Sequence, residues 1–152
     1  MSASSLDSIN QFMSYPEYAV IGVSRNQKGF GWQTYNHLKK GGYSAFPVNR
    51  FPGTYNGLTY YGSVSSIPQA PKAAVVVTPA SENRTLIQDL ITQGIEAIWL
   101  QPGAVSEEAV QVGLQNNLVL VYGWCILMFA EPVRSIHWLH RKYLEVTGRM
   151  PR

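Results

Sequence analysis

The chain has 152 residues, of which 45% are hydrophobic and 14% are charged, so it is typical of one globular domain and excludes an intrinsically disordered protein. Its one cysteine, Cys125, excludes an intramolecular disulfide. The net charge of +3 comes entirely from residues 123–152, so the chain lacks the broad basic face that is typical of proteins that bind nucleic acid.

In chain order, the apolar spacing first predicts a short amphipathic helix, an apolar strand, a second helix and a second strand. These elements span residues 6–13, 18–23, 32–40 and 44–48. Residues 49–71 are rich in Gly, Pro, Tyr and Ser, which predicts irregular structure. A third strand follows at 73–77, and Ser81 is a suitable N-cap for a helix that ends at residue 93.

The second half of the chain continues this alternation. It predicts a fourth strand at 97–100, a helix capped by Ser106 and a fifth strand at 118–122. The last predicted helix spans residues 133–147. Its apolar residues fall at helical spacing and are predicted to pack on the rest of the chain; they are Ile136, Leu139, Tyr143 and Val146.

Short apolar strands separated by helices predict βαβ units with a parallel sheet. Right-handed crossovers then give an α/β, Rossmann-like, doubly wound sheet of about five strands, in a single domain over residues 1–152 with a C-terminal helix. In such sheets ligands bind beyond the carboxyl ends of the strands, where this chain places glycine, proline, small polar and basic residues. The predicted cofactor-binding residues are Gly22, Val23, Ser24, Arg25, Lys28, Phe30 and Gly31 after the first strand, Asn49 and Arg50 after the second, Thr78, Pro79, Ala80 and Asn83 after the third, Gln101, Pro102 and Gly103 after the fourth, and Cys125 after the fifth.

The loop after the first strand has the chemistry of a phosphate site. Its glycines allow the backbone to approach a ligand closely, and the following helix offers unpaired N–H groups at its start. Arg25 and Lys28 add positive charge. The NAD fingerprint G-x-G-x-x-G is absent, and Arg50 stands where an acid would bind the ribose. An arginine there suits the extra phosphate of NADP or the 3′-phosphate of coenzyme A.

The segments AVIGVSRNQKGFG, FPVNR, AAVVVTPAS, GIEAIWLQPGAVSEEA and VYGWCIL follow one another over roughly residues 15–130. This ordered set resembles the stand-alone CoA-binding proteins, which are similar to the CoA-binding domain of the succinyl-CoA synthetase alpha subunit. The resemblance implies a Rossmann-like fold that binds coenzyme A. It implies that residues 22–25 hold the ADP phosphates, that Asn49 and Arg50 supply a basic group, and that residues 78–80 lie along the cofactor. Many relatives have Val-Asn-Pro-Lys where this chain has VNRFP.

Three functional hypotheses follow. The first is a protein that binds coenzyme A or an acyl-CoA without turnover, as a carrier or a sensor, with no catalytic residue assigned. The second is an NADP-dependent oxidoreductase or redox sensor on the same fold. The third is an interaction module that uses its basic C-terminal helix; a protein partner or a homodimer stays open.

Other candidate chemistry is weaker. His137 and His140 can lie together on one helix, but a zinc site needs a third ligand, so no metal site is predicted. Cys125 is interpreted as a buried structural thiol, with oxidative capture of coenzyme A as the alternative. Tyr55, Tyr60 and Tyr61 are interpreted as surface packing.

The sequence also predicts the cellular location of the protein. No apolar run reaches the roughly 18 residues of a membrane-spanning helix. The first residues, MSASSLDSIN, lack the basic start and apolar core of a signal peptide. We therefore expect a cytoplasmic protein that binds neither membrane nor nucleic acid.

Overall fold

The computed structural model describes residues 3–83, 85–132 and 135–151, and its centre is a parallel sheet of five strands in the order β2-β1-β5-β6-β7. The strands are β1 (Glu17–Ile21), β2 (Ser44–Val48), β5 (Ala73–Val76), β6 (Ala97–Leu100) and β7 (Val119–Val121). From β1 the chain moves outward to β2 and then returns to the other side of β1 to form β5. This confirms the doubly wound, Rossmann-like fold, and it places the reversal of strand order between β1 and β5.

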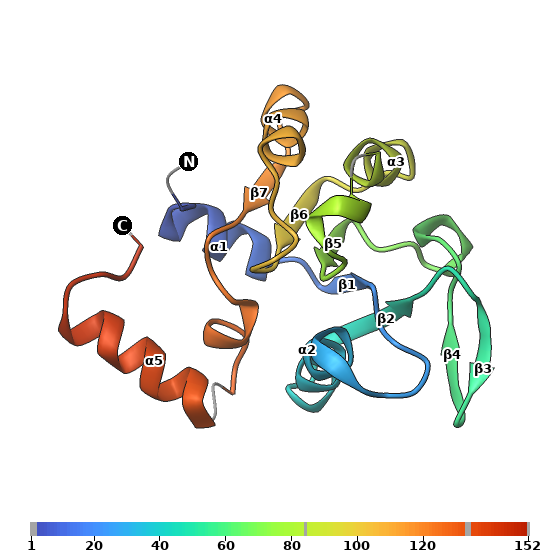
Figure 1. Ribbon diagram of the computed structural model, residues 1–152, viewed down its shortest axis with the longest axis horizontal. Coiled ribbons are helices and arrows are strands. Elements are labelled where there is room, and N and C mark those ends of the chain that lie inside the picture. Colours follow the sequence, from blue (N-terminus) through green and yellow to red (C-terminus); the bar gives the residue numbers. More distant parts are fainter. Residues whose placement is uncertain (1–2, 84, 133–134, 152) are drawn as a thin grey trace.

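Helices cover both faces of the sheet (Figure 1). On one face, α1 (Leu6–Met13) and α2 (Gly29–Lys40) pack with the 3-10 turn Ile126–Met128, and the C-terminal helix α5 (Ser135–Val146) lies beyond that turn. On the other face lie α3 (Leu86–Thr92) and α4 (Glu107–Gln115). Because both faces are covered, every residue of β5 and β6 is buried, as their continuous apolar sequences require.

Most of residues 49–71 lie outside helices and strands, as predicted, but short elements within them were missed. They form an antiparallel hairpin of β3 (Gly53–Tyr55) and β4 (Leu58–Tyr60), followed by the 3-10 turn Val64–Ser66. The hairpin turns at Asn56 and Gly57, whose φ angles of 50° and 74° are both in the left-handed region. An Asn-Gly pair between short strands is a strong hairpin signal, because both residues adopt that conformation readily.

Two predicted helix starts were wrong. Helix α2 begins at Gly29, one turn before the predicted start. Helix α3 begins at Leu86, and Ser81 lies instead in a 3-10 turn over Ala80–Glu82. The buried Asn83 explains this turn, since its side-chain amide donates to the carbonyl groups of Thr78 and Ala104 and fixes the chain between β5 and α3.

The C-terminal helix forms as predicted, but it packs with the opposite face. Leu139, Tyr143 and Val146 are 61%, 53% and 85% exposed, so the prediction that they pack on the body was wrong; the side chain of Ile136 lies outside the described residues. Leu144 is buried instead, and the Arg141 guanidinium donates to the carbonyl group of Met128. Within the described ranges, no helix is long and apolar enough to cross a membrane.

Candidate functional site

A cleft of about 510 Å³ opens at the point where the strand order reverses. The carboxyl ends of β1, β2 and β5 form its floor, and α3 and the turn at residues 62–64 form its walls. Parallel strands place their carboxyl ends at one edge, so three of the five predicted strand-end loops meet here.

The turn after β1 depends on two glycines. Gly22 has a φ of +100°, a conformation that side chains rarely allow, and its N–H donates to the carbonyl group of Val48. Gly31, in the first turn of α2, touches the backbone of Gly22: a Cβ on Gly31 would lie 2.2 Å from the Gly22 carbonyl oxygen. Gly31 therefore allows the start of α2 to press against the end of β1, beside the cleft.

Hydrogen bonds fix the rest of this loop. The Ser24 hydroxyl accepts from the N–H of Lys28, and the Asn49 side-chain amide donates to the Val23 carbonyl group at 2.8 Å. The Tyr60 hydroxyl, on the hairpin, donates to the Ser24 carbonyl group at 3.1 Å. Tyr60 is only 1% exposed, so the interpretation of this tyrosine as surface packing was wrong.

Two arginines lie around one aromatic ring at the cleft mouth. The Arg25 guanidinium carbon is 4.8 Å from the centre of the Phe51 ring and 4.9 Å from that of Tyr55, and Arg25 donates to the Tyr55 hydroxyl at 3.2 Å. The Arg50 guanidinium carbon is 5.8 Å from the Phe51 ring centre. Arg50 also forms an exposed ion pair with Glu82 at 3.5 Å. The two arginines line a shallow hollow of about 530 Å³ that shares Ser24, Asn49 and Arg50 with the cleft.

The wall formed by α3 was missed in the sequence analysis. Leu86, Asp89, Leu90 and Gln93 line the cleft from one side of this helix. Their i, i+3, i+4 and i+7 spacing marks one helical face and is the signal that was available. Asp89 makes this side of the cleft acidic, Arg25 and Arg50 make the other side basic, and Glu82 lies between them in its ion pair with Arg50.

The structure brings together some of the predicted site residues and separates others. Those that line the cleft are Gly22, Ser24, Asn49, Arg50, Thr78, Pro79 and Asn83, and Arg25 lines the adjoining hollow. The others are not among the residues that line either space; they are Val23, Lys28, Phe30, Gly31, Ala80, Gln101, Pro102, Gly103 and Cys125.

The loops after β6 and β7 play a supporting part. Gln101 is fully buried; its side-chain oxygen accepts from the N–H of Ile126 at 3.1 Å, and its amide donates to the Thr34 hydroxyl. The N–H of Ala80 donates to the Gly103 carbonyl group at 2.9 Å, which joins this loop to the loop after β5. Cys125 follows β7, which lies two strands away from β5 in the sheet.

Cys125 is expected to react slowly with iodoacetamide in the folded protein. Burial raises the pKa of its thiol, so less thiolate is present at pH 8 than in an exposed cysteine, and the thiolate is the reactive form. Intact-mass measurements should show labelling about tenfold slower than in urea. Equal rates in the two conditions would favour oxidative capture of coenzyme A over a buried structural thiol.

His137 and His140 both lie on the C-terminal helix. In the ranges that the structure describes, no three His, Cys, Asp or Glu side chains gather in a way that could hold a metal ion. The pKa of His137 is lowered by its partial burial and by nearby His37 and His140.

Comparison with known families gives one match, to a family model described as a CoA binding domain, over residues 16–131. This range covers well over half of the chain. No curated protein sequence matches the chain.

Solved structures share the fold. A conserved hypothetical protein from Pyrococcus furiosus is 28% identical, with a TM-score of 0.67, over 74% of this chain and 97% of that one. A hypothetical protein from Pyrococcus horikoshii OT3 is 20% identical, with a TM-score of 0.71, over 83% and 93%. The apo form of a dinucleotide-forming acetyl-coenzyme A synthetase from Ca. Korarchaeum cryptofilum is 23% identical, with a TM-score of 0.57, over 68% of this chain and 25% of that one.

Proposed function

This chain belongs to the CoA-binding domain family, and we propose that it binds coenzyme A or an acyl-CoA at the carboxyl ends of β1, β2 and β5. The observation that carries the proposal is the pair of arginines around Phe51. Both guanidinium groups line one hollow, and Glu82 pairs with Arg50, so an anion in the hollow would be attracted by Arg25 and would replace Glu82 on Arg50. The phosphates of the cofactor are such an anion.

Different parts of the cleft would bind the charged and the uncharged parts of the cofactor. Arg25 and Arg50 would bind phosphate, and the glycine turn at Gly22 would let the backbone approach it. The α3 wall would take an uncharged part, because Leu86 and Leu90 offer apolar contact and acidic groups beside them repel phosphate. Residues 101–103 and Cys125 would support the surrounding loops.

We propose binding without turnover, as a carrier or a sensor. Among the described residues that line the cleft, none is a histidine, a cysteine or a lysine. The hydroxyls of Ser24, Ser63 and Thr78 bond to backbone, Ser65 and Asn83, so none of them is hydrogen-bonded to a base. The protein should therefore release no thiol from acetyl-CoA at a rate above that of buffer. Steady release that depends on Arg50 would contradict this part of the proposal.

Coenzyme A is expected to raise the melting temperature, and NAD is not. At a free ligand concentration ten times Kd, binding adds about 1.4 kcal/mol to the free energy of unfolding. For a chain of this length that corresponds to roughly 3–6 °C. Differential scanning fluorimetry with coenzyme A, NAD and NADP tests this. An equal or larger shift with NADP would favour the oxidoreductase hypothesis instead.

Glu82→Gln is expected to tighten coenzyme A binding by up to about fivefold, the equivalent of about 1 kcal/mol. Glu82 forms an ion pair with Arg50 in the ligand-free protein, so a phosphate that binds Arg50 must displace the Glu82 carboxylate. Glu96→Gln is the matched control, because Glu96 forms an exposed ion pair with Lys72 at the opposite edge of the sheet. Titration calorimetry measures both variants, and unchanged or weaker binding by Glu82→Gln would show that Glu82 does not compete with the ligand.

A further inference from the structure

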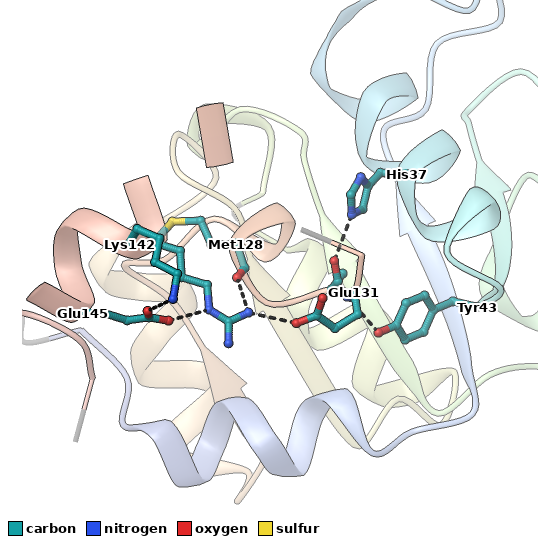
Figure 2. A network of polar contacts seen from close by, with 8 residues as sticks. His37, Tyr43, Met128, Glu131, Lys142 and Glu145 are labelled. Atoms are coloured by element: carbon teal, nitrogen blue, oxygen red, sulfur yellow. Dashed lines mark hydrogen bonds and ion pairs between the residues drawn. The ribbon is translucent and has the colours of Figure 1, made fainter. Parts of the chain in front are cut away.

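Helix α5 is attached to the rest of the protein by one face. Arg141 lies at the centre of this attachment: it donates to the Met128 carbonyl group, and its guanidinium forms ion pairs with Glu131 at 2.9 Å and Glu145 at 3.1 Å. Figure 2 shows this network, which also joins Glu131 to the hydroxyl of Tyr43. Leu144, one turn further along, is buried. The orientation of α5 is therefore fixed by specific contacts.

The opposite face of α5 is apolar and exposed. Leu139, Tyr143 and Val146, called here the outer seam, are 61%, 53% and 85% exposed. Trp138, next to the seam, is 48% exposed. A surface helix that is already docked usually presents polar residues outward, so a row of large apolar side chains there indicates a binding surface.

The spacing of the outer seam suits a helix as the partner. Its residues are separated by four and then three positions, which is the repeat by which apolar residues line the contact between two packed helices. In the sequence, Ile136 precedes Leu139 by three and extends the same repeat. A three-turn helix such as α5 offers a small contact area, so the complex should be weak and transient.

The charges beside the outer seam indicate which charge the partner should carry. In a pair of helices, the residues that flank the apolar row face those of the partner; on α5 these are His140 and Lys142, and Thr147 and Arg149 follow just after its last residue. Lys142 and Arg149 are basic; Lys142 shares Glu145 with Arg141, so one acid faces two cations on this helix. A second copy packed antiparallel would place these cations against each other.

We propose that the outer seam of α5 binds an amphipathic helix of another protein whose flanking positions are acidic. This surface lies outside the range of the family match and does not use the coenzyme A cleft. The inference therefore stands on its own observations, independent of the ligand.

The test uses a synthetic 21-residue helical peptide with leucine along its apolar row and glutamate at the flanking positions, labelled with fluorescein. Glutamates on both sides keep this peptide from pairing with itself. Anisotropy should show micromolar binding to the full chain that weakens as salt rises. The same peptide with lysine at the flanking positions should bind at least about tenfold more weakly.

Variants locate the binding to the seam. Leu139→Glu and Val146→Glu should each weaken peptide binding about tenfold or more, since they place a charge in an apolar contact. Leu114→Glu on α4 is the matched control, because Leu114 is also 53% exposed, and it should leave binding unchanged. An unchanged melting temperature shows that each variant folds.

Three outcomes would overturn the proposal. The first is no binding of the acidic peptide at millimolar concentration, or equal binding of both peptides. The second is a dimer in sedimentation velocity that Val146→Glu dissociates, which would assign the seam to a second copy. The third is cosedimentation with vesicles of anionic lipid that Leu139→Glu abolishes, which would assign it to a membrane surface.

Discussion

Gly31→Ala is expected to lower the free energy of unfolding by about 2 kcal/mol or more, and to weaken coenzyme A binding as well. The added Cβ would lie 2.2 Å from the Gly22 carbonyl oxygen and 3.0 Å from its carbon, so the new methyl group meets backbone that cannot rotate away. Overpacking of this kind typically costs about 1–3 kcal/mol and occasionally more. Because Gly22 forms the turn beside the cleft, the shift that relieves the clash also displaces the site.

Gly113→Ala is the matched control for this prediction. Gly113 also lies within a helix, but its Cβ would meet the ends of the flexible Leu120 side chain at 3.0 and 3.2 Å. The gain in helix propensity, about 1 kcal/mol, offsets that contact, so stability should change by less than about 1 kcal/mol. Urea unfolding of both variants measures the difference. Equal losses would mean that the contact between Gly31 and Gly22 is not what limits substitution.

Arg25→Ala is expected to weaken coenzyme A binding about 10- to 100-fold, because a charge-assisted hydrogen bond contributes about 1.5–3 kcal/mol. Arg25 is already held in place by the rings of Phe51 and Tyr55, so little side-chain entropy is lost when it binds a phosphate. Titration calorimetry at two salt concentrations should also show that the remaining binding is less sensitive to salt.

Arg149→Ala controls for the loss of one positive charge. Arg149, like Arg25, donates to a tyrosine hydroxyl, that of Tyr143 at 3.3 Å, but it lies beyond α5 and away from the cleft. Its substitution should leave the affinity for coenzyme A within about twofold of the parent, since distant exposed charges are screened by salt. Normal binding by Arg25→Ala, together with lost binding by Arg50→Ala, would move the phosphate site to the loop after β2.

The sheet and its ligand edge were predictable from the sequence because they depend on local patterns. The run AAVV at residues 73–76 is apolar on both sides of a strand, which predicts a sheet covered by helices on both faces. In the structure every residue of β5 is buried. Glycine after the first strand marks a turn that needs a positive φ, and Gly22 has one. Once the strands are parallel, their carboxyl ends must meet, so the loops at Gly22, Asn49 and Thr78 lie together.

The contacts that hold the first loop in place were not predicted, because they join segments that are distant in the sequence. Arg25 is positioned by Tyr55, 30 residues away, and Ser24 by Tyr60, 36 residues away. Both tyrosines arrive on a hairpin whose Asn-Gly turn could be recognised, but whose position over the first loop could not. A turn signal specifies local backbone angles and leaves open where the hairpin will pack.

Helix α5 shows most clearly which features follow from the sequence pattern and which follow from tertiary contacts. The sequence by itself determined that a helix would form and that Leu139, Tyr143 and Val146 would share one of its faces, since both follow from helical periodicity. Which face would touch the body was decided by the tertiary structure. There, the guanidinium of Arg141 donates to the Met128 carbonyl group and forms an ion pair with Glu131, and Leu144 is buried against the rest of the chain. Periodicity says which residues lie together, whereas the side that is buried depends on the partners that the rest of the chain presents.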